Sequence, residues 1–188
     1  MKINGNEIRP GNVIQHKGHL WVAVKTQAVK PGKGPAYAQV ELKNAIDGTK
    51  LNERFRSSET VERVRLEQND YQFLYEQGDM LVFMDMDTYD QVYITPEVVG
   101  DAANYLLEGF EAVVAMYEGA PLYIELPAAV ELVIEYTEPG VQGDRSTGGS
   151  KPARLETGYE IGVPLFITTG EKVKVDTRTG DYLGRVNN

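Results

Sequence analysis

The sequence predicts an all-β protein made of three small barrels. Short runs rich in Val, Ile and aromatic residues recur along the 188-residue chain, and Gly, Pro, Asn and Asp separate them. Their spacing favours small β-barrels over a parallel α/β sheet. Hydrophobic residues make up 41% of the chain, which is enough to form folded cores.

The expected strands lie in all three thirds of the chain. In the first third they are 13–15, 21–26, 37–42 and 53–56. In the middle third they are 80–84, 92–94, 112–117 and 122–126, and in the last third 131–136, 162–167 and 172–175. Asp47-Gly48 is a hairpin signal between the runs 43–46 and 50–55.

One short helix is expected at 100–110, where Tyr105, Leu106 and Phe110 give partial helical spacing and Gly109 is able to end the helix. The segment 138–153 has the composition of a long loop between strands. No other segment departs from the pattern of short strands and turns.

Charge and proline divide the chain into three domains. Residues 1–64 hold 11 Lys/Arg and 6 Asp/Glu (+5), residues 65–128 hold one Arg and 13 Asp/Glu (−12), and residues 129–188 hold 7 and 9 (−2). Pro127 interrupts strand-like sequence at the second boundary. We expect domains at 1–64, 65–128 and 129–188. The basic first domain predicts a polyanionic partner at one end only, and the acidic middle discourages non-specific adhesion to RNA.

Several classes of protein are disfavoured by what the chain lacks. It has no Cys, which excludes disulfides, thiolate metal sites and cysteine nucleophiles. Its first residues form no apolar signal segment, and no apolar stretch approaches the ~18 residues that span a membrane. We therefore expect a cytoplasmic protein without membrane contact.

Groups for catalysis are also few. His16 and His19 are the only histidines, no Ser lies in a G-x-S-x-G pattern, and Gly149 stands where a phosphate-binding loop needs Lys. We expect no enzyme, no metal site and no cofactor.

The most informative segment is Pro31-Gly32-Lys33-Gly34-Pro35, which lies between two strand-like runs. The glycines allow backbone conformations closed to other residues, and the prolines restrict the loop. Together they present one long cationic side chain at a stiffened hairpin tip. Such a lysine serves as a probe or as a target for covalent extension; the alternative is a solvated turn with an incidental lysine.

Three segments, in the right order along the whole chain, resemble bacterial elongation factor P. The run 29–44 resembles the tip of that family's first domain, and Gly100-Asp101-Ala102-Ala103 resembles a loop of its second domain. The third segment resembles the family's C-terminal signature and includes Lys151-Pro152-Ala153, Val163-Pro164 and the run 175–182.

The resemblance implies an SH3-like (KOW-like) first barrel followed by two oligonucleotide-binding (OB) folds, in an L-shaped arrangement like that of tRNA. It implies a monomeric translation elongation factor that binds the 70S ribosome between the P and E sites. There it would contact rRNA of both subunits, the P-site peptidyl-tRNA and the E-site mRNA codon. It would stimulate peptide-bond formation and relieve stalling at consecutive prolines.

The resemblance also implies roles for individual residues. Lys33 would contact the 3′ end of the P-site tRNA after a ligase extends it, by β-lysylation in many members. Its loop would be shaped by Pro31, Gly32, Gly34 and Pro35. The exit-site codon loop would be Gly100, Asp101, Ala102 and Ala103, with Ala102 where many members have Asn. The loop near the small subunit would include Thr147, Gly148 and Gly149. Further tRNA or rRNA contacts would be Lys30, Arg54, Arg56, Tyr182 and Arg185.

Two other functions stay open at this point. A general RNA-binding or RNA-chaperone protein would use OB barrels with aromatic platforms and basic grooves, although the acidic middle argues against a continuous groove. A small hydrolase would need two carboxylates with perturbed pKa values in one pocket.

Overall fold

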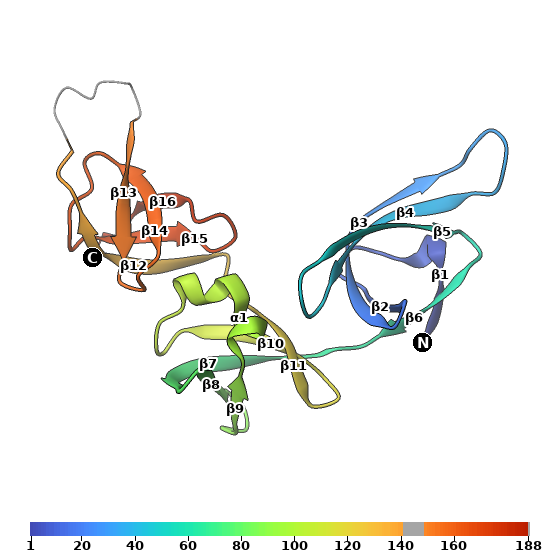
Figure 1. The fold of residues 1–188 in the computed structure, drawn as a ribbon, viewed down its shortest axis with the longest axis horizontal. Helices are drawn as coiled ribbons and strands as arrows, with labels where there is room; N and C mark the ends of the chain where they lie inside the picture. Colours follow the sequence, from blue (N-terminus) through green and yellow to red (C-terminus); the bar gives the residue numbers. More distant parts are fainter. Residues whose placement is uncertain (141–148, 188) are drawn as a thin grey trace. The chain divides into compact units, whose positions relative to one another are not determined.

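The computed structural model describes residues 1–140 and 149–187, and these residues form an all-β protein with three sheets (Figure 1). This confirms the predicted fold class. The chain divides into two compact units: Met1–Gln68 with Ala115–Tyr123, and Asn69–Val114 with Ile124–Asn188. No helix of the described residues is long and apolar enough to cross a membrane.

The first sheet has six antiparallel strands in the order β1-β6-β2-β3-β4-β5. Its elements are β1 Lys2–Asn4, the 3-10 helix η1 Gly5–Glu7, β2 Val13–His16, β3 His19–Val29, β4 Tyr37–Asn44, β5 Lys50–Arg56 and β6 Thr60–Val64. Along β4, Ala38, Val40 and Leu42 are buried at every second position, as the strand period requires. They pack with Trp21 and Phe55 in one core.

The second sheet has five strands in the order β11-β10-β7-β8-β9. Its elements are β7 Glu67–Gln77, β8 Met80–Asp85, β9 Gln91–Ile94, the helix α1 Pro96–Val99, the 3-10 helix η2 Gly100–Tyr105, β10 Glu111–Tyr117 and β11 Ala120–Glu125. Leu81 and Phe83 are buried on the core side of β8, and the Phe83 ring lies 5.3 Å from that of Phe73.

The third sheet has five strands in the order β14-β13-β12-β15-β16. They are β12 Ala129–Thr137, β13 Ser150–Leu155, β14 Glu160–Pro164, β15 Lys172–Asp176 and β16 Tyr182–Arg185. Leu132, Ile134 and Leu155 are fully buried in its core. Tyr105, from η2 of the preceding barrel, belongs to the same core, so the second and third barrels share a packed contact within one unit.

One six-residue turn occurs in all three sheets, at 44–49, 85–90 and 176–181. In each, the side-chain oxygen of the first residue (Asn44, Asp85 or Asp176) accepts hydrogen bonds from the third and fourth backbone N–H groups. The first carbonyl accepts from the fifth N–H at 2.8–3.0 Å. The fifth residue has a positive φ in every case: +76° at Gly48, +80° at Gly180 and +65° at Tyr89.

Several predictions about elements were wrong in their bounds. The helical segment begins at Pro96 and ends at Tyr105, not at 100–110, because Thr95 caps α1 with its side chain, Pro96 starts it, and Leu106 is extended. The loop predicted at 138–153 ends earlier, because Ser150–Leu155 is a strand paired with β14. Residues 141–148 of that loop lie outside the described residues.

Candidate functional site

The predicted hairpin around Lys33 is present. Strands β3 and β4 pair up to Val29 opposite Tyr37, and residues 30–36 connect them. The hairpin extends beyond the neighbouring strands of its sheet, with the connecting loop at its end (Figure 1). Lys33 is exposed at the middle of this loop, and among the described residues its ammonium group has no ion-pair partner.

The two glycines beside Lys33 differ in what they do. Gly34 has φ +103°, in the range that favours glycine, and a Cβ added there would lie 3.9 Å from Pro31 Cγ. Gly32 has no such φ, and a Cβ added there would meet nothing within 4 Å. The backbone direction at the tip therefore depends on Gly34. Pro31 is half-buried, whereas Pro35 is exposed.

Strand β5 places two arginines beside the base of the loop. Arg56 lies opposite Tyr37, and Arg54 lies opposite Gln39 with its guanidinium carbon 4.3 Å from the centre of the Tyr37 ring. The Ser57 N–H donates to the Ala36 carbonyl at 3.1 Å, which ties the end of the loop to the strand that carries both arginines.

We call Lys30, Lys33, Arg54 and Arg56 the basic tip cluster. All four side chains are exposed, and among the described residues none has a carboxylate within 4.0 Å. Cations without internal partners are available to an anionic ligand, and an RNA backbone supplies many phosphates. Lys33 was found from the sequence, but Tyr37 was not, because its role depends on the register between β4 and β5.

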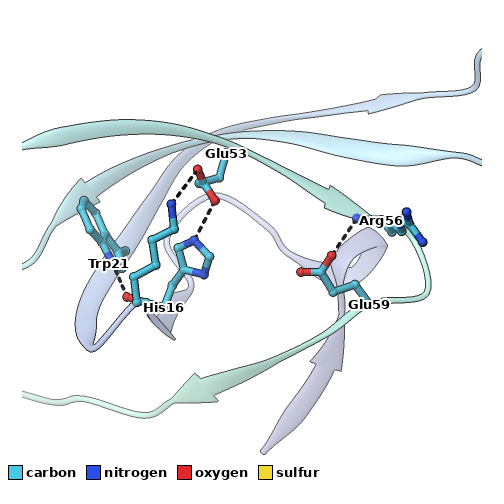
Figure 2. A network of polar contacts seen from close by, with 6 residues as sticks. His16, Trp21, Glu53, Arg56 and Glu59 are labelled. Atoms are coloured by element: carbon cyan, nitrogen blue, oxygen red, sulfur yellow. Dashed lines mark hydrogen bonds and ion pairs between the residues drawn. The ribbon is translucent and has the colours of Figure 1, made fainter.

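The middle of β5 is fixed by a polar network (Figure 2). His16 Nε2 lies 2.8 Å from one oxygen of Glu53, Lys17 Nζ lies 3.4 Å from the other, and the Trp21 indole N–H donates to the His16 carbonyl at 2.9 Å. The hydrogen bond with His16, and then that with Lys17, hold the pKa of Glu53 below its usual value. The network joins β5 to the β2–β3 turn and so steadies the strand that carries Arg54.

The two histidines do not converge on a metal. His16 pairs with Glu53, and His19 places its ring 6.3 Å from the Trp21 ring, edge to face. In residues 1–140 and 149–187, no group of three or more His, Asp or Glu side chains could hold a metal ion.

The shifted carboxylates serve the fold. In the described part of the chain, the pKa values of Asp47, Glu53, Asp85 and Glu171 all lie below their usual values, through hydrogen bonds from Thr49, His16, Asp87 and Thr168 respectively. A hydrolase that uses a carboxylic acid would need one raised pKa. None of these four carboxyl groups has the raised pKa that such a role requires.

The predicted codon loop follows directly on α1, where the Gly100 N–H donates to the Pro96 carbonyl. Gly100 begins η2 with φ +58°, and Asp101 and Ala103 are exposed. At the other end of η2, Tyr105 is buried, its ring lies 5.4 Å from the Tyr159 ring, and Thr157 Oγ1 donates to the Asn104 carbonyl at 2.6 Å. Burial, followed by the hydrogen bond with Tyr159, raises the pKa of Tyr105 to about 12. The end of η2 is thus fastened to the third barrel, while Asp101 stays exposed.

The remaining predicted contacts lie in the third barrel. Tyr182 is half-buried against its core. The Arg185 guanidinium lies 2.9 Å from Glu171 and 4.5 Å from the centre of the Phe166 ring, so it also stabilises its own barrel. Gly149 is half-buried just before β13, whereas Thr147 and Gly148 lie outside the described residues.

Three family profiles match consecutive parts of the chain. They are the elongation factor P (EF-P) KOW-like domain at residues 4–61, the elongation factor P (EF-P) OB domain at 66–124, and the elongation factor P C-terminal domain at 130–185. They agree with a KOW-like barrel followed by OB folds.

Relatives named elongation factor P match nearly the whole chain. That of Streptomyces coelicolor is 60% identical over 183 residues, which is 97% of each chain, and that of Parvibaculum lavamentivorans is 60% identical over 187 residues, or 100% of each.

Solved structures show the fold alone at lower identity. Initiation factor 5A from Methanococcus jannaschii has a TM-score of 0.51 at 23% identity, covering 67% of this chain and 94% of its own. An initiation factor 5A family protein from Naegleria fowleri has a TM-score of 0.51 at 16% identity, covering 67% and 98%.

Proposed function

Because the chain belongs to the bacterial elongation factor P family of translation factors, we propose that it stimulates peptide-bond formation on ribosomes stalled at consecutive prolines. In this proposal it binds the 70S ribosome between the P and E sites as a monomer in the cytoplasm. Lys33 acts on the 3′ end of the P-site tRNA. The observation that carries the proposal is the exposed Lys33, without an internal partner, at a tip whose backbone direction depends on Gly34.

The physical effect is positioning. Proline is a hindered acceptor, and a misplacement of ~1 Å between reacting groups can cost ~100-fold in rate. A factor that holds the peptidyl-tRNA in its reactive geometry accelerates the transfer without supplying an acid, a base or a nucleophile. A chain poor in catalytic groups can therefore raise a rate, and it needs no cofactor.

The basic side chains beside the tip support the proposal that this end of the protein faces RNA. Lys30, Arg54 and Arg56 lie beside the tip without internal carboxylate partners among the described residues. Charge-assisted hydrogen bonds from such groups to phosphate oxygens are short and strong. We assign these three side chains to backbone phosphates of tRNA or rRNA, and Lys33 to the tRNA terminus.

Covalent extension of Lys33 fits the shape of the hairpin. A barrel is too wide to follow the tRNA terminus into a narrow site, whereas a single side chain is not. A β-lysyl group joined to Nζ by a separate ligase would lengthen the reach and keep a terminal cation. The exposed position of Lys33 leaves Nζ open to such an enzyme.

The loop Gly100–Ala103 contacts the E-site codon in this proposal. Asp101 and Ala103 are exposed, and the buried Tyr105 fastens the loop. Because Ala102 has no polar side-chain atom, contact at that position comes from the backbone.

The proposal is tested with a reporter that contains three consecutive prolines, translated in a reconstituted system without its own elongation factor P. The additions are buffer, the protein purified from its native source, Lys33→Ala, and Lys174→Ala as a matched control that removes an exposed lysine from the third barrel. We expect full-length product with the native protein and with Lys174→Ala, and none above buffer with Lys33→Ala. Equal product with and without the native protein, once peptide mass has established the state of its Lys33, would rule the function out.

A further inference from the structure

The middle barrel has a partly exposed apolar face, on the side of its sheet that Leu81 and Phe83 do not occupy. The register places Tyr75, Val82 and Tyr93 next to one another across β7, β8 and β9, three strands that lie side by side (Figure 1). Tyr75 is 39% exposed and Tyr93 52% exposed, while Val82 between them is buried. Met80 and Met84 lie two residues to either side of Val82 and share its face of the strand. We call these five residues the Tyr-Met face.

A third tyrosine lies in the turn that joins β8 and β9, and its backbone conformation is one that disfavours residues other than glycine. Tyr89 occupies the fifth position of the β8–β9 turn with φ +65°, where the equivalent turns of the other two barrels have Gly48 and Gly180. Residues other than glycine are uncommon in this region because Cβ crowds the backbone. The Tyr89 side chain is 69% exposed, so internal packing does not account for it.

The charge around this face is strongly negative. The turns at the two ends of β8 carry Asp79, Asp87 and Asp90, all exposed, and in the described part of the chain none of them forms an ion pair. Residues 65–128 contain one Arg and 13 Asp/Glu. Aromatic side chains on an OB fold can stack bases, but that binding also requires cations for the phosphates, and this face has carboxylates instead.

The other two barrels indicate which kind of side chain these tyrosines can bind. In the first barrel Arg54 lies over Tyr37 at 4.3 Å, and in the third Arg154 lies over Tyr136 at 5.9 Å. The middle barrel has the aromatic rings and lacks the arginines to stack on them. A guanidinium stacks well on a tyrosine face, and it also pairs with carboxylates.

We propose that the Tyr-Met face, together with Tyr89, is a docking surface for an Arg-rich segment of a partner protein. Arginine side chains stack on the tyrosines and pair with the carboxylates of the two turns. Between these contacts, the methionine side chains pack against the aliphatic parts of the arginines, since their flexible thioethers fit irregular surfaces. This surface is separate from the basic tip cluster, and the inference does not depend on the role proposed for Lys33.

The test uses the full-length protein and a fluorescein-labelled 12-residue peptide of alternating Arg and Gly, with binding followed by anisotropy. A labelled 12-nucleotide oligouridine is the second probe. The variants are Tyr75→Ala/Tyr93→Ala and, as a matched control, Tyr136→Ala, which removes a tyrosine of similar exposure (50%) from the third barrel. We expect the double variant to weaken peptide binding by about tenfold, from two exposed cation–π contacts, and the control to stay within about twofold.

Tyr89→Gly adds a test with two readouts of opposite sign. Because glycine fits φ +65° without strain, this variant should melt at a higher temperature than the wild type and yet bind the peptide several-fold more weakly. The proposal is overturned by peptide binding that is unchanged in both the double variant and Tyr89→Gly. It is also overturned if oligouridine binding is what the double variant loses, because the occupant would then be RNA.

Discussion

Gly34→Ala tests whether the tip of the hairpin works through its backbone direction. The φ of Gly34 is +103°, well beyond the +50° to +70° that an L residue tolerates on the left-handed side. Such a conformation costs a non-glycine residue on the order of 1–3 kcal/mol. The new methyl group would lie 3.9 Å from Pro31 Cγ, which is an ordinary contact, so the cost is backbone strain and not a clash.

The strain should be relieved locally. The loop is exposed, so the backbone can change direction at the tip while the barrel stays folded. A cost of about 1–3 kcal/mol corresponds to a roughly 5- to 150-fold smaller population of the original tip conformation. We therefore expect a loss of activity within that range, with the melting temperature nearly unchanged.

The assay compares Gly34→Ala with Gly32→Ala in the three-proline reporter, with circular dichroism as the measure of folding. Gly32 has no positive φ, and its added Cβ would meet nothing within 4 Å, so its variant is the matched control and should keep near wild-type activity. Equal activities of the two variants would refute the reasoning, because the backbone of Gly34 would then have no special part.

Three further predictions concern stability. Gly180→Ala should lower the melting temperature, because Gly180 has φ +80° and its added Cβ would lie 3.0 Å from Tyr105 Oη; a melting curve like that of Gly158→Ala (φ +93°, open space) would show that the contact does not matter. Leu132→Ala, at a fully buried site, should cost about 2–5 kcal/mol in urea unfolding, and a smaller loss would mean that the core collapses around the cavity. Folding lowers the pKa values of Glu53 and Glu171, so their contribution to the free energy of unfolding is present above the unfolded pKa of about 4.3 and is lost as pH falls through the folded values. The melting temperature should therefore decrease as the pH is lowered from about 5, and it should decrease less steeply in Glu171→Gln than in the wild type. Equal pH profiles of the two proteins would contradict this.

Strands with strong side-chain alternation were predictable from the sequence, and polar ones were not. The run 37–42 lies within β4, whose inward positions are apolar. Strand β7 begins with Glu67-Gln68-Asn69-Asp70, four exposed polar residues, and is held in the sheet by pairing rather than by its own composition. Strand β13 was missed because the composition of the whole segment 138–153 is typical of a loop, although Pro152 within it pairs with Gly162 of β14.

The candidate site was predictable only where it is local. Pro31-Gly32-Lys33-Gly34-Pro35 identifies its own hairpin, because each residue type constrains the turn that contains it. The placement of Arg54 over Tyr37 depends on strand register, and the pairing of Arg185 with Glu171 depends on the closure of the third barrel. The spacing of these residues along the sequence predicts neither contact. The sequence alone does not mark Tyr89 as unusual. Its unusual position is recognised only from its positive φ and from the glycines at the same place in the two equivalent turns.

The most direct test of the central claim is the rate of Pro-Pro bond formation on defined ribosome complexes, measured by rapid quench with the native protein and with Lys33→Ala. Binding of both proteins to the same ribosomes is measured in parallel. The proposed role of Lys33 predicts that both proteins bind and that only the native protein raises the rate. Equal acceleration by Lys33→Ala would contradict it, since the barrel alone would then be sufficient.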